Sequence, residues 1–352
     1  MELTEILKYA IAQNASDVFI SAGLPLSFRK NGELCQEEGE KLLPADTERL
    51  LEDLYRNAGN RSMDELHKTG DDDFSFGITG LSRFRVSAYR QRGTLSAVIR
   101  IISFNLPDFT SLHIPEYVLH LGDGGKGMIL VTGPAGSGKS TTLACIIDQI
   151  NRNQCRHIVT LEDPLEYLHR HGRSIVSQRE INVDTESYVT ALRAALRQSP
   201  DVILLGEMLD NETARVAMSA AETGRLLFST LHTVGAVNTI HRIIDAFPEN
   251  QQRQISVQLS AVLTAIVSQQ LLPTVDGGMV PAMEIMTVTP AVRNMIRENK
   301  IQQIDGILYS SLQDDMVSMD GSILAWYKQG MISKDTALKY AVSPDMLKRK
   351  LS

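Results

Sequence analysis

The residues Gly-Pro-Ala-Gly-Ser-Gly-Lys-Ser at positions 133–140 constrain the fold of this chain more than any other segment. They follow an apolar run at residues 128–131 and precede Thr-Thr-Leu-Ala at residues 141–144, so the pattern predicts a strand, a glycine-rich loop and a helix. Glycines let backbone N–H groups turn inward around a phosphate, and the helix N-terminus adds partial positive charge. We therefore expect ATP to bind at Gly133, Pro134, Ala135, Gly136, Ser137, Gly138, Lys139, Ser140 and Thr141.

Two acidic segments follow strand-like runs further along the chain. Glu162 ends one such run, with Asp163 and Glu166 close behind it, and Glu207 ends another after Gly206. The carboxyl ends of parallel strands meet at one edge of a sheet, so these carboxylates are expected to face the γ-phosphate or its Mg²⁺. We predict that Mg²⁺ is held through phosphate or water by Ser140, Glu162 and Glu207. A solvated acidic turn is the alternative for the first segment.

A third strand-like run ends in Thr230 and His232. On the same sheet edge, a hydroxyl or an imidazole can report whether the terminal phosphate is present, although a lone histidine is more often structural. In the first third of the chain, Arg83 and Arg85 alternate with Phe84 and Val86 and so share one strand face. A solvated basic face is one interpretation, and an arginine that neutralises transition-state charge is the other.

The chain is predicted to contain two domains of the α/β class. Residues 1–104 have the pattern of a small α+β domain, residues 105–112 around Pro107 form a linker, and residues 113–352 form a P-loop domain. Strands are expected at residues 127–132, 157–161, 202–206 and 226–230, alternating with helices at residues 139–151, 186–198 and 211–223. The remainder from about 235 to 352 is expected to be helical, including an amphipathic helix over residues 254–275.

The net charge and the amino-terminal sequence argue against a nucleic-acid-binding protein and against an exported one. The net charge is −7, which disfavours direct nucleic-acid binding and a DNA translocase. The first residues carry acid where a signal peptide carries basic residues, so we expect a cytoplasmic protein. The uncharged residues 254–275 contain several Gln and Ser side chains and are not expected to span a membrane.

Together these motifs resemble the type II/IV secretion-type ATPases, and most closely the type IV pilus retraction motors. The resemblance runs over nearly the whole chain. It rests on residues 15–25, 83–86, 133–140, 161–169, 206–208, 230–233, 242–248 and 296–300.

The resemblance implies a PAS-like N-terminal domain, a RecA-like ATPase domain and a homo-hexamer that powers pilus retraction and twitching motility. It also implies peripheral attachment to the inner face of the cytoplasmic membrane, through a platform protein of the pilus. By matching positions, Glu166 is the general base, Glu207 the Walker-B acid and His232 the residue of the His box. Arg85 and Arg100 are the implied arginine fingers.

The chain departs from the family pattern at three places. Leu209 stands where an arginine is usual, Val234 and Gly235 replace a polar pair, and His241 replaces an aspartate. These changes remove polar groups near the predicted catalytic residues. The alternative function is therefore an ATP-binding regulator or assembly factor with weak or no hydrolysis.

Overall fold

The computed structural model describes residues 2–30, 32–102, 106, 108–208, 210–311 and 315–351. The chain divides into two compact units, one built on residues 1–105 together with 166–168, and the other on residues 106–165 and 169–352. Of the predicted boundary, Phe104, Asn105 and Pro107 lie outside the described residues. Within the described ranges, none of the helices has the length and apolar character that a membrane span needs.

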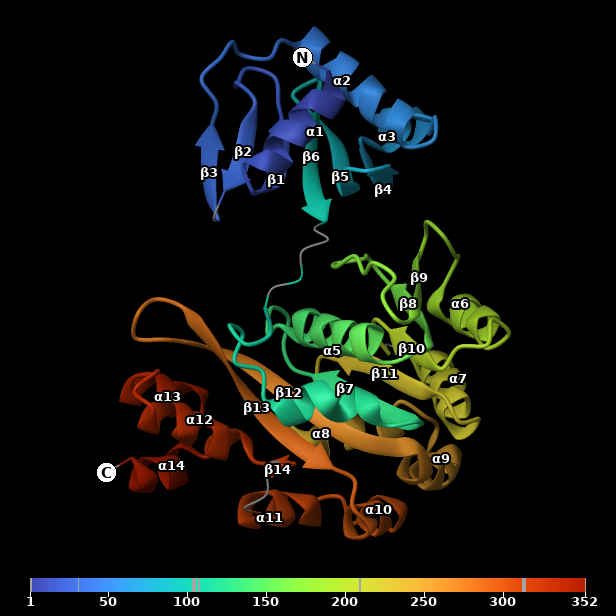
Figure 1. The fold of residues 1–352 in the computed structure, drawn as a ribbon, viewed down its shortest axis with the longest axis vertical. Coiled ribbons are helices and arrows are strands. Elements are labelled where there is room, and N and C mark those ends of the chain that lie inside the picture. Colours follow the sequence, from blue (N-terminus) through green and yellow to red (C-terminus); the bar gives the residue numbers. More distant parts are fainter. Residues whose placement is uncertain are drawn as a thin grey trace. The chain divides into compact units, whose positions relative to one another are not determined.

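The first unit is an antiparallel six-stranded sheet with the order β3-β2-β1-β6-β5-β4, packed against helices (Figure 1). Apolar side chains alternate with polar ones along β5, so Phe84 and Val86 enter the core while Arg85 stays exposed. Leu51 and Leu54 of α2 fill the same core. The strands are β1 (Ala15–Ile20), β2 (Ser27–Lys30), β3 (Glu33–Gln36), β4 (Asp71–Ile78), β5 (Ser82–Gln91) and β6 (Thr94–Ile102), and the helices are α1 (Leu3–Ala12), α2 (Pro44–Asn57) and α3 (Asp64–Thr69).

The second unit is built on an eight-stranded sheet with the order β14-β13-β12-β7-β11-β10-β8-β9. The strands from β12 to β9 in this order are parallel, and β13 and β14 run antiparallel to their neighbours. The strands are β7 (Gly127–Thr132), β8 (His157–Glu162), β9 (Ile175–Glu180), β10 (Val202–Leu205), β11 (Leu226–Leu231), β12 (Leu263–Pro273), β13 (Met279–Thr287) and β14 (Met316–Val317).

Helices cover both faces of this sheet, which confirms the predicted α/β class (Figure 1). They are α4 (Glu116–Leu119), a 3-10 turn η1 (His120–Asp123), α5 (Lys139–Asn153), α6 (Tyr188–Ala195), α7 (Asn211–Glu222), α8 (Ala236–Asp245), α9 (Glu249–Val262), α10 (Pro290–Arg297), α11 (Gln303–Ser310), α12 (Met319–Lys328), α13 (Lys334–Tyr340) and α14 (Pro344–Lys350).

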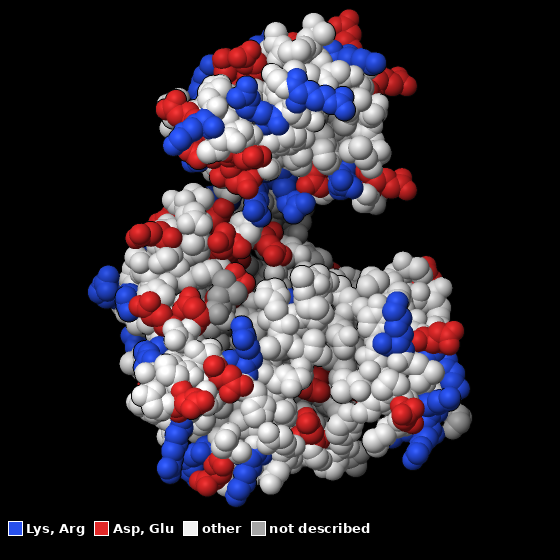
Figure 2. Space-filling view, turned by 180° about the vertical axis from the view of Figure 1, so that it is seen from behind, with Lys and Arg blue, Asp and Glu red and all other residues white. Residues whose placement is uncertain are grey.

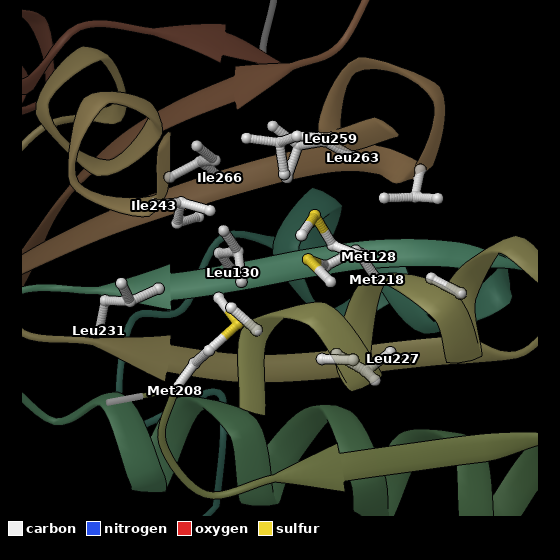
Figure 3. Packing of buried hydrophobic residues seen from close by; sticks show 14 of the residues in the cluster. Met128, Leu130, Met208, Met218, Leu227, Leu231, Ile243, Leu259, Leu263 and Ile266 are labelled. Carbon is white, nitrogen blue, oxygen red and sulfur yellow. The ribbon is translucent and has the colours of Figure 1, made fainter. Parts of the chain in front are cut away.

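The central strand β7 shows why the sheet is buried on both sides. Met128 and Leu130 belong to one apolar cluster, and Ile129 and Val131 belong to the cluster on the opposite face. In the first cluster, side chains from β7, β11 and β12 interlock with Met218 of α7 and with residues of α8 and α9 (Figure 3). Burial on both faces fixes the strand ends, on which the predicted site depends.

The prediction for the C-terminal part was wrong in one respect. Residues 254–275 are not a single helix, because α9 ends at Val262 and β12 follows at Leu263. The region 235–352 therefore contributes β12, β13 and β14 to the sheet besides its helices. The edge strand β9, which is rich in polar residues, was also not predicted. Pairing with β7 and β13 satisfies the backbone of β12 and decides its conformation.

Candidate functional site

The glycine-rich loop connects β7 to α5, as predicted. Gly133, Gly136 and Gly138 have φ values of 141°, 75° and 85°, a region that favours glycine. A Cβ at Gly133 would lie 2.2 Å from the carbonyl oxygen of Gln269, so a side chain there cannot be accommodated. The backbone turns that a phosphate cradle requires are thus built into the loop.

Lys139, the first residue of α5, is buried and makes hydrogen bonds to the start of the loop. Its Nζ atom donates hydrogen bonds to the carbonyl oxygens of Gly133 (2.9 Å) and Pro134 (3.0 Å). The Oγ atom of Ser137 is buried and has no hydrogen-bond partner among the described residues. An ammonium group, an unpaired hydroxyl and a helix N-terminus together fit a bound phosphate.

The predicted strand-end residues follow three neighbouring parallel strands. Glu162 ends β8, Glu207 follows β10, and His232 follows β11, which lies next to β7. The structure pairs two of them, because Nε2 of His232 lies 3.5 Å from Oε2 of Glu207. The Thr230 hydroxyl donates to the Gly206 carbonyl at 2.6 Å and so fastens these two strand ends together. Residues distant in sequence thus meet at one edge of the sheet.

Gly206 stands at this edge because the backbone there is crowded. A Cβ at position 206 would lie 2.9 Å from the hydroxyl of Tyr188 and 3.1 Å from the carbonyl oxygen of Leu161. Burial is the main cause that raises the pKa of Tyr188, and the nearby charge of Glu207 raises it further. Tyr188 is the first residue of α6, and no motif in the sequence marked it as part of the site.

Glu166, the predicted general base, is grouped with the first unit, together with residues 167 and 168. It is exposed in an irregular segment that follows a cis Asp163–Pro164 bond. Glu162 is the last residue of β8, and its Oε1 accepts a hydrogen bond from Gln178 of β9 at 3.5 Å. Within the second unit, the structure therefore brings two of the predicted catalytic residues, Glu207 and His232, into direct contact.

A Mg²⁺ ion would need ligands from the nucleotide as well as from the protein. In the described parts of the chain, no group of three or more His, Cys, Asp and Glu side chains could hold a metal ion. Mg²⁺ usually binds one or two carboxylates together with substrate phosphates and water. Ser140, Glu162 and Glu207 offer the hydroxyl and carboxylate oxygens that such a site uses.

The two predicted arginine fingers are cross-strand neighbours in the first unit. Arg85 of β5 is opposite Arg100 of β6, and Arg100 is opposite Asp17 of β1. Like charges at directly opposed positions repel each other, and a counter-ion relieves this repulsion. The buried Asp17 carboxylate provides it, at 3.0 Å from Nε of Arg100 and 3.5 Å from Nε of Arg29. We call Arg29, Asp17, Arg100 and Arg85 the arginine row.

The three departures from the family pattern lie in different surroundings. Leu209 lies outside the described residues. Val234 is 41% exposed, in the connection between β11 and α8. His241 lies on α8, with its Nε2 atom 3.4 Å from the Gln302 side-chain nitrogen.

Acidic and basic side chains are mixed over the face that Figure 2 shows, and no continuous basic stripe crosses the second unit there. Nucleic-acid-binding surfaces usually gather Lys and Arg on one face. The described Lys and Arg side chains that Figure 2 shows on the second unit do not gather in that way.

Comparisons with known proteins agree with this geometry. The family model "Type II/IV secretion system protein" matches residues 1–305. The type IV pilus retraction ATPase PilT of Pseudomonas aeruginosa is 39% identical over 345 residues, 98% of this chain and 99% of that protein. A twitching motility protein of Neisseria gonorrhoeae is 45% identical over 276 residues, 78% of this chain and 74% of that protein.

A solved structure also resembles the whole chain. The crystal structure of the pilus retraction motor PilT with bound ADP matches with a TM-score of 0.90 and 44% sequence identity, over 99% of both chains. The family model and this relative both extend across the first unit and the glycine-rich loop. The chain therefore belongs to the type II/IV secretion system protein family and is a P-loop ATPase of that family.

Proposed function

We propose that this ATPase powers the retraction of a type IV pilus, and thereby twitching motility, as a ring of six copies. The observation that carries the proposal is the glycine-rich loop beside the Glu207–His232 pair, in a chain similar from end to end to a named retraction ATPase. The ring would act at the inner face of the cytoplasmic membrane, attached through a platform protein of the pilus and without direct nucleic-acid contact.

In the proposed mechanism, each residue of the site has a separate task. Lys139 and the loop N–H groups bind the phosphates. Ser140, Glu162 and Glu207 would hold Mg²⁺, which would neutralise negative charge on the phosphates. Glu207 orients the attacking water, and Glu166 accepts its proton. His232, held by Glu207 at 3.5 Å, reports on the terminal phosphate.

The arginine row completes this mechanism from another subunit. In the proposed ring, Arg85 and Arg100 of one copy neutralise the transition-state charge at the loop of a neighbouring copy. Hydrolysis then depends on assembly, since one copy alone lacks part of the site. Differences in the affinity of ATP and ADP for two conformations would drive the motion.

The test is Mg²⁺-dependent ATP hydrolysis by the purified protein, measured at increasing protein concentration. We expect the activity per subunit to rise with concentration and to be lost in Lys139→Ala and Arg85→Ala. Glu207→Gln should bind ATP but reduce kcat by at least about 100-fold, because it loses the carboxylate that orients water. Normal steady-state hydrolysis by Glu207→Gln would show that this assignment is wrong.

The same measurement distinguishes the alternative function. An ATP-binding regulator would bind ATP at every concentration without turnover. Leu209→Arg, which restores the usual residue of the family, should then raise the rate. An unchanged low rate in that variant would exclude Leu209 as the cause.

A further inference from the structure

The glycine-rich loop is held by one side chain from a strand that is distant in the sequence. Gln269 of β12 is 3% exposed, and both ends of its amide group make hydrogen bonds. Its Nε2 donates to the carbonyl oxygen of Ser137 at 2.7 Å, and its Oε1 accepts from the Thr142 hydroxyl at 2.8 Å. One amide therefore ties the end of the loop to the first turn of α5.

Gln269 also lies so close to the loop that it leaves no room for side chains at two of the loop glycines. A Cβ at Gly138 would lie 2.9 Å from Nε2 of Gln269, and the backbone of Gln269 excludes a side chain at Gly133. Both glycines thus need to be glycine partly because Gln269 lies against them. The shape of the loop and the position of Gln269 depend on each other.

The strand that carries Gln269 is itself fixed on both sides. It pairs with β7 on one side and with β13 on the other. The adjacent Ser268 accepts a hydrogen bond from the N–H of Gly235 at 2.8 Å, and Glu284, opposite Ser268, accepts one from Ala236 at 2.7 Å. These bonds anchor the start of α8, just after Thr230 and His232. Two consecutive residues of β12 therefore contact the loop and the segment that follows β11.

We propose that Gln269 is a positioning residue of the ATPase: through Ser137 and Thr142 it holds the glycine-rich loop in the shape that binds the nucleotide phosphates. A fixed amide on a rigid strand lowers the reorganisation that binding would otherwise require. The proposal rests on nucleotide binding at the loop and not on the identity of the filament. In this proposal Gln269 acts on the nucleotide only through the loop and does not contact the nucleotide directly.

The test compares the full-length protein with Gln269→Ala and, as a matched control, Gln270→Ala. Gln270 is the same residue type at the next position of β12, and it is more exposed than Gln269. We expect Gln269→Ala to raise the Kd of ADP and the KM of ATP by about tenfold, which corresponds to the loss of one to two hydrogen bonds. The effect on kcat should be smaller. Gln270→Ala should stay within about twofold of the unaltered chain.

A double-mutant cycle separates positioning from simple packing. Thr142→Val removes the hydroxyl that donates to Gln269 without altering β12, and it should weaken ADP binding in the unaltered chain but not in Gln269→Ala. This variant also keeps the proposal testable if Gln269→Ala does not fold. Additive effects would overturn the proposal, as would a Gln269→Ala protein with lower thermal stability but an unchanged Kd for ADP. If the unaltered chain and Gln270→Ala bind no ADP at all, nucleotide binding at the loop is itself wrong.

Discussion

At the scale of single residues, the site depends on close approaches that only certain side chains allow. Gly206 is the clearest case, because the hydroxyl of Tyr188 and the carbonyl of Leu161 occupy the space that a Cβ would need. The lack of space for a Cβ therefore explains why a glycine stands at position 206. This glycine brings the β10 strand end close to α6, and Glu207 follows at once. The adjacent carboxylate then reaches His232.

His169 makes a residue-scale prediction about pH. Burial lowers the pKa of this imidazole to about 4, and its Nδ1 atom has no hydrogen-bond partner among the described residues. Above about pH 6.5 the side chain is neutral in both the folded and the unfolded chain. Between about pH 6.5 and 4 the unfolded chain binds a proton that the folded chain does not. The free energy of unfolding should therefore fall as the pH is lowered, by at most about 1.4 kcal/mol per pH unit from this group.

Urea unfolding measured from pH 7.5 to 4.5 checks this expectation. His169→Gln should flatten the dependence in that window. His67→Gln, at an exposed position, should leave it unchanged. Equal slopes in His169→Gln and the unaltered chain would mean that other groups cause the acid sensitivity.

At the scale of elements, the change from α9 to β12 is a boundary that could not be predicted from the sequence. Strands such as β7, β10 and β11 were predicted within a residue, because each is a short apolar run bounded by turn residues. No Gly or Pro occurs between residues 249 and 272, so nothing in the sequence marks the change from helix to strand at Leu263. The strand forms because β7 and β13 pair with it.

The same junction explains why part of the site was not predicted. Glu207 and His232 follow recognisable strands, and their meeting at one sheet edge could be expected from the topology alone. Gln269 lies in a segment that was interpreted as helical, where its amide has no assigned partner. The sequence offers only a glutamine within a largely apolar run at residues 262–272. Its meaning depends on tertiary pairing, which one sequence does not reveal.

Glu284 makes a prediction for the start of α8. Burial raises the pKa of its carboxyl group, whose oxygens accept hydrogen bonds from the backbone of Ala236 and Met319 at the first residues of α8 and α12. Glu284→Ala leaves these buried N–H groups unpaired and should lower the free energy of unfolding by about 1–3 kcal/mol. Glu284→Gln keeps an acceptor oxygen and should lose much less. Urea unfolding of the two variants measures the difference, and equal losses would show that charge and not hydrogen bonding is what matters.

At the scale of the whole molecule, the predicted phosphate-binding loop and the proposed arginine fingers lie in two separate units. The glycine-rich loop belongs to the second unit, and the arginine row belongs to the first. In the proposed ring, one complete site uses the loop of one copy and the arginines of another. A ring that mixes copies with a defective loop and copies with a defective arginine row should therefore retain some complete sites and some ATP hydrolysis.

Mixing two inactive variants tests this arrangement. Lys139→Ala retains the arginine row, and Arg85→Ala retains the loop, so each homo-oligomer should lack hydrolysis. After co-assembly, the interfaces that join an intact loop to an intact arginine row should recover part of the activity. In an alternating ring, this amounts to at most about half of the sites. A mixture as inactive as its components would exclude a site shared between copies, and Lys139→Ala mixed with Lys139→Ala,Arg85→Ala is the matched control.

The arginine row has one more consequence for how a phosphate is recognised. Arg100 already forms an ion pair with Asp17, so its positive charge is compensated before a phosphate binds. In the proposed role, a phosphate must replace the Asp17 carboxylate as the partner of Arg100. The free energy of phosphate binding from Arg100 is then only the difference between the two ion pairs. In this role, a phosphate with two or three negative charges would attract Arg100 more strongly than a singly charged anion would. Asp17 would pair with Arg100 again when the phosphate leaves.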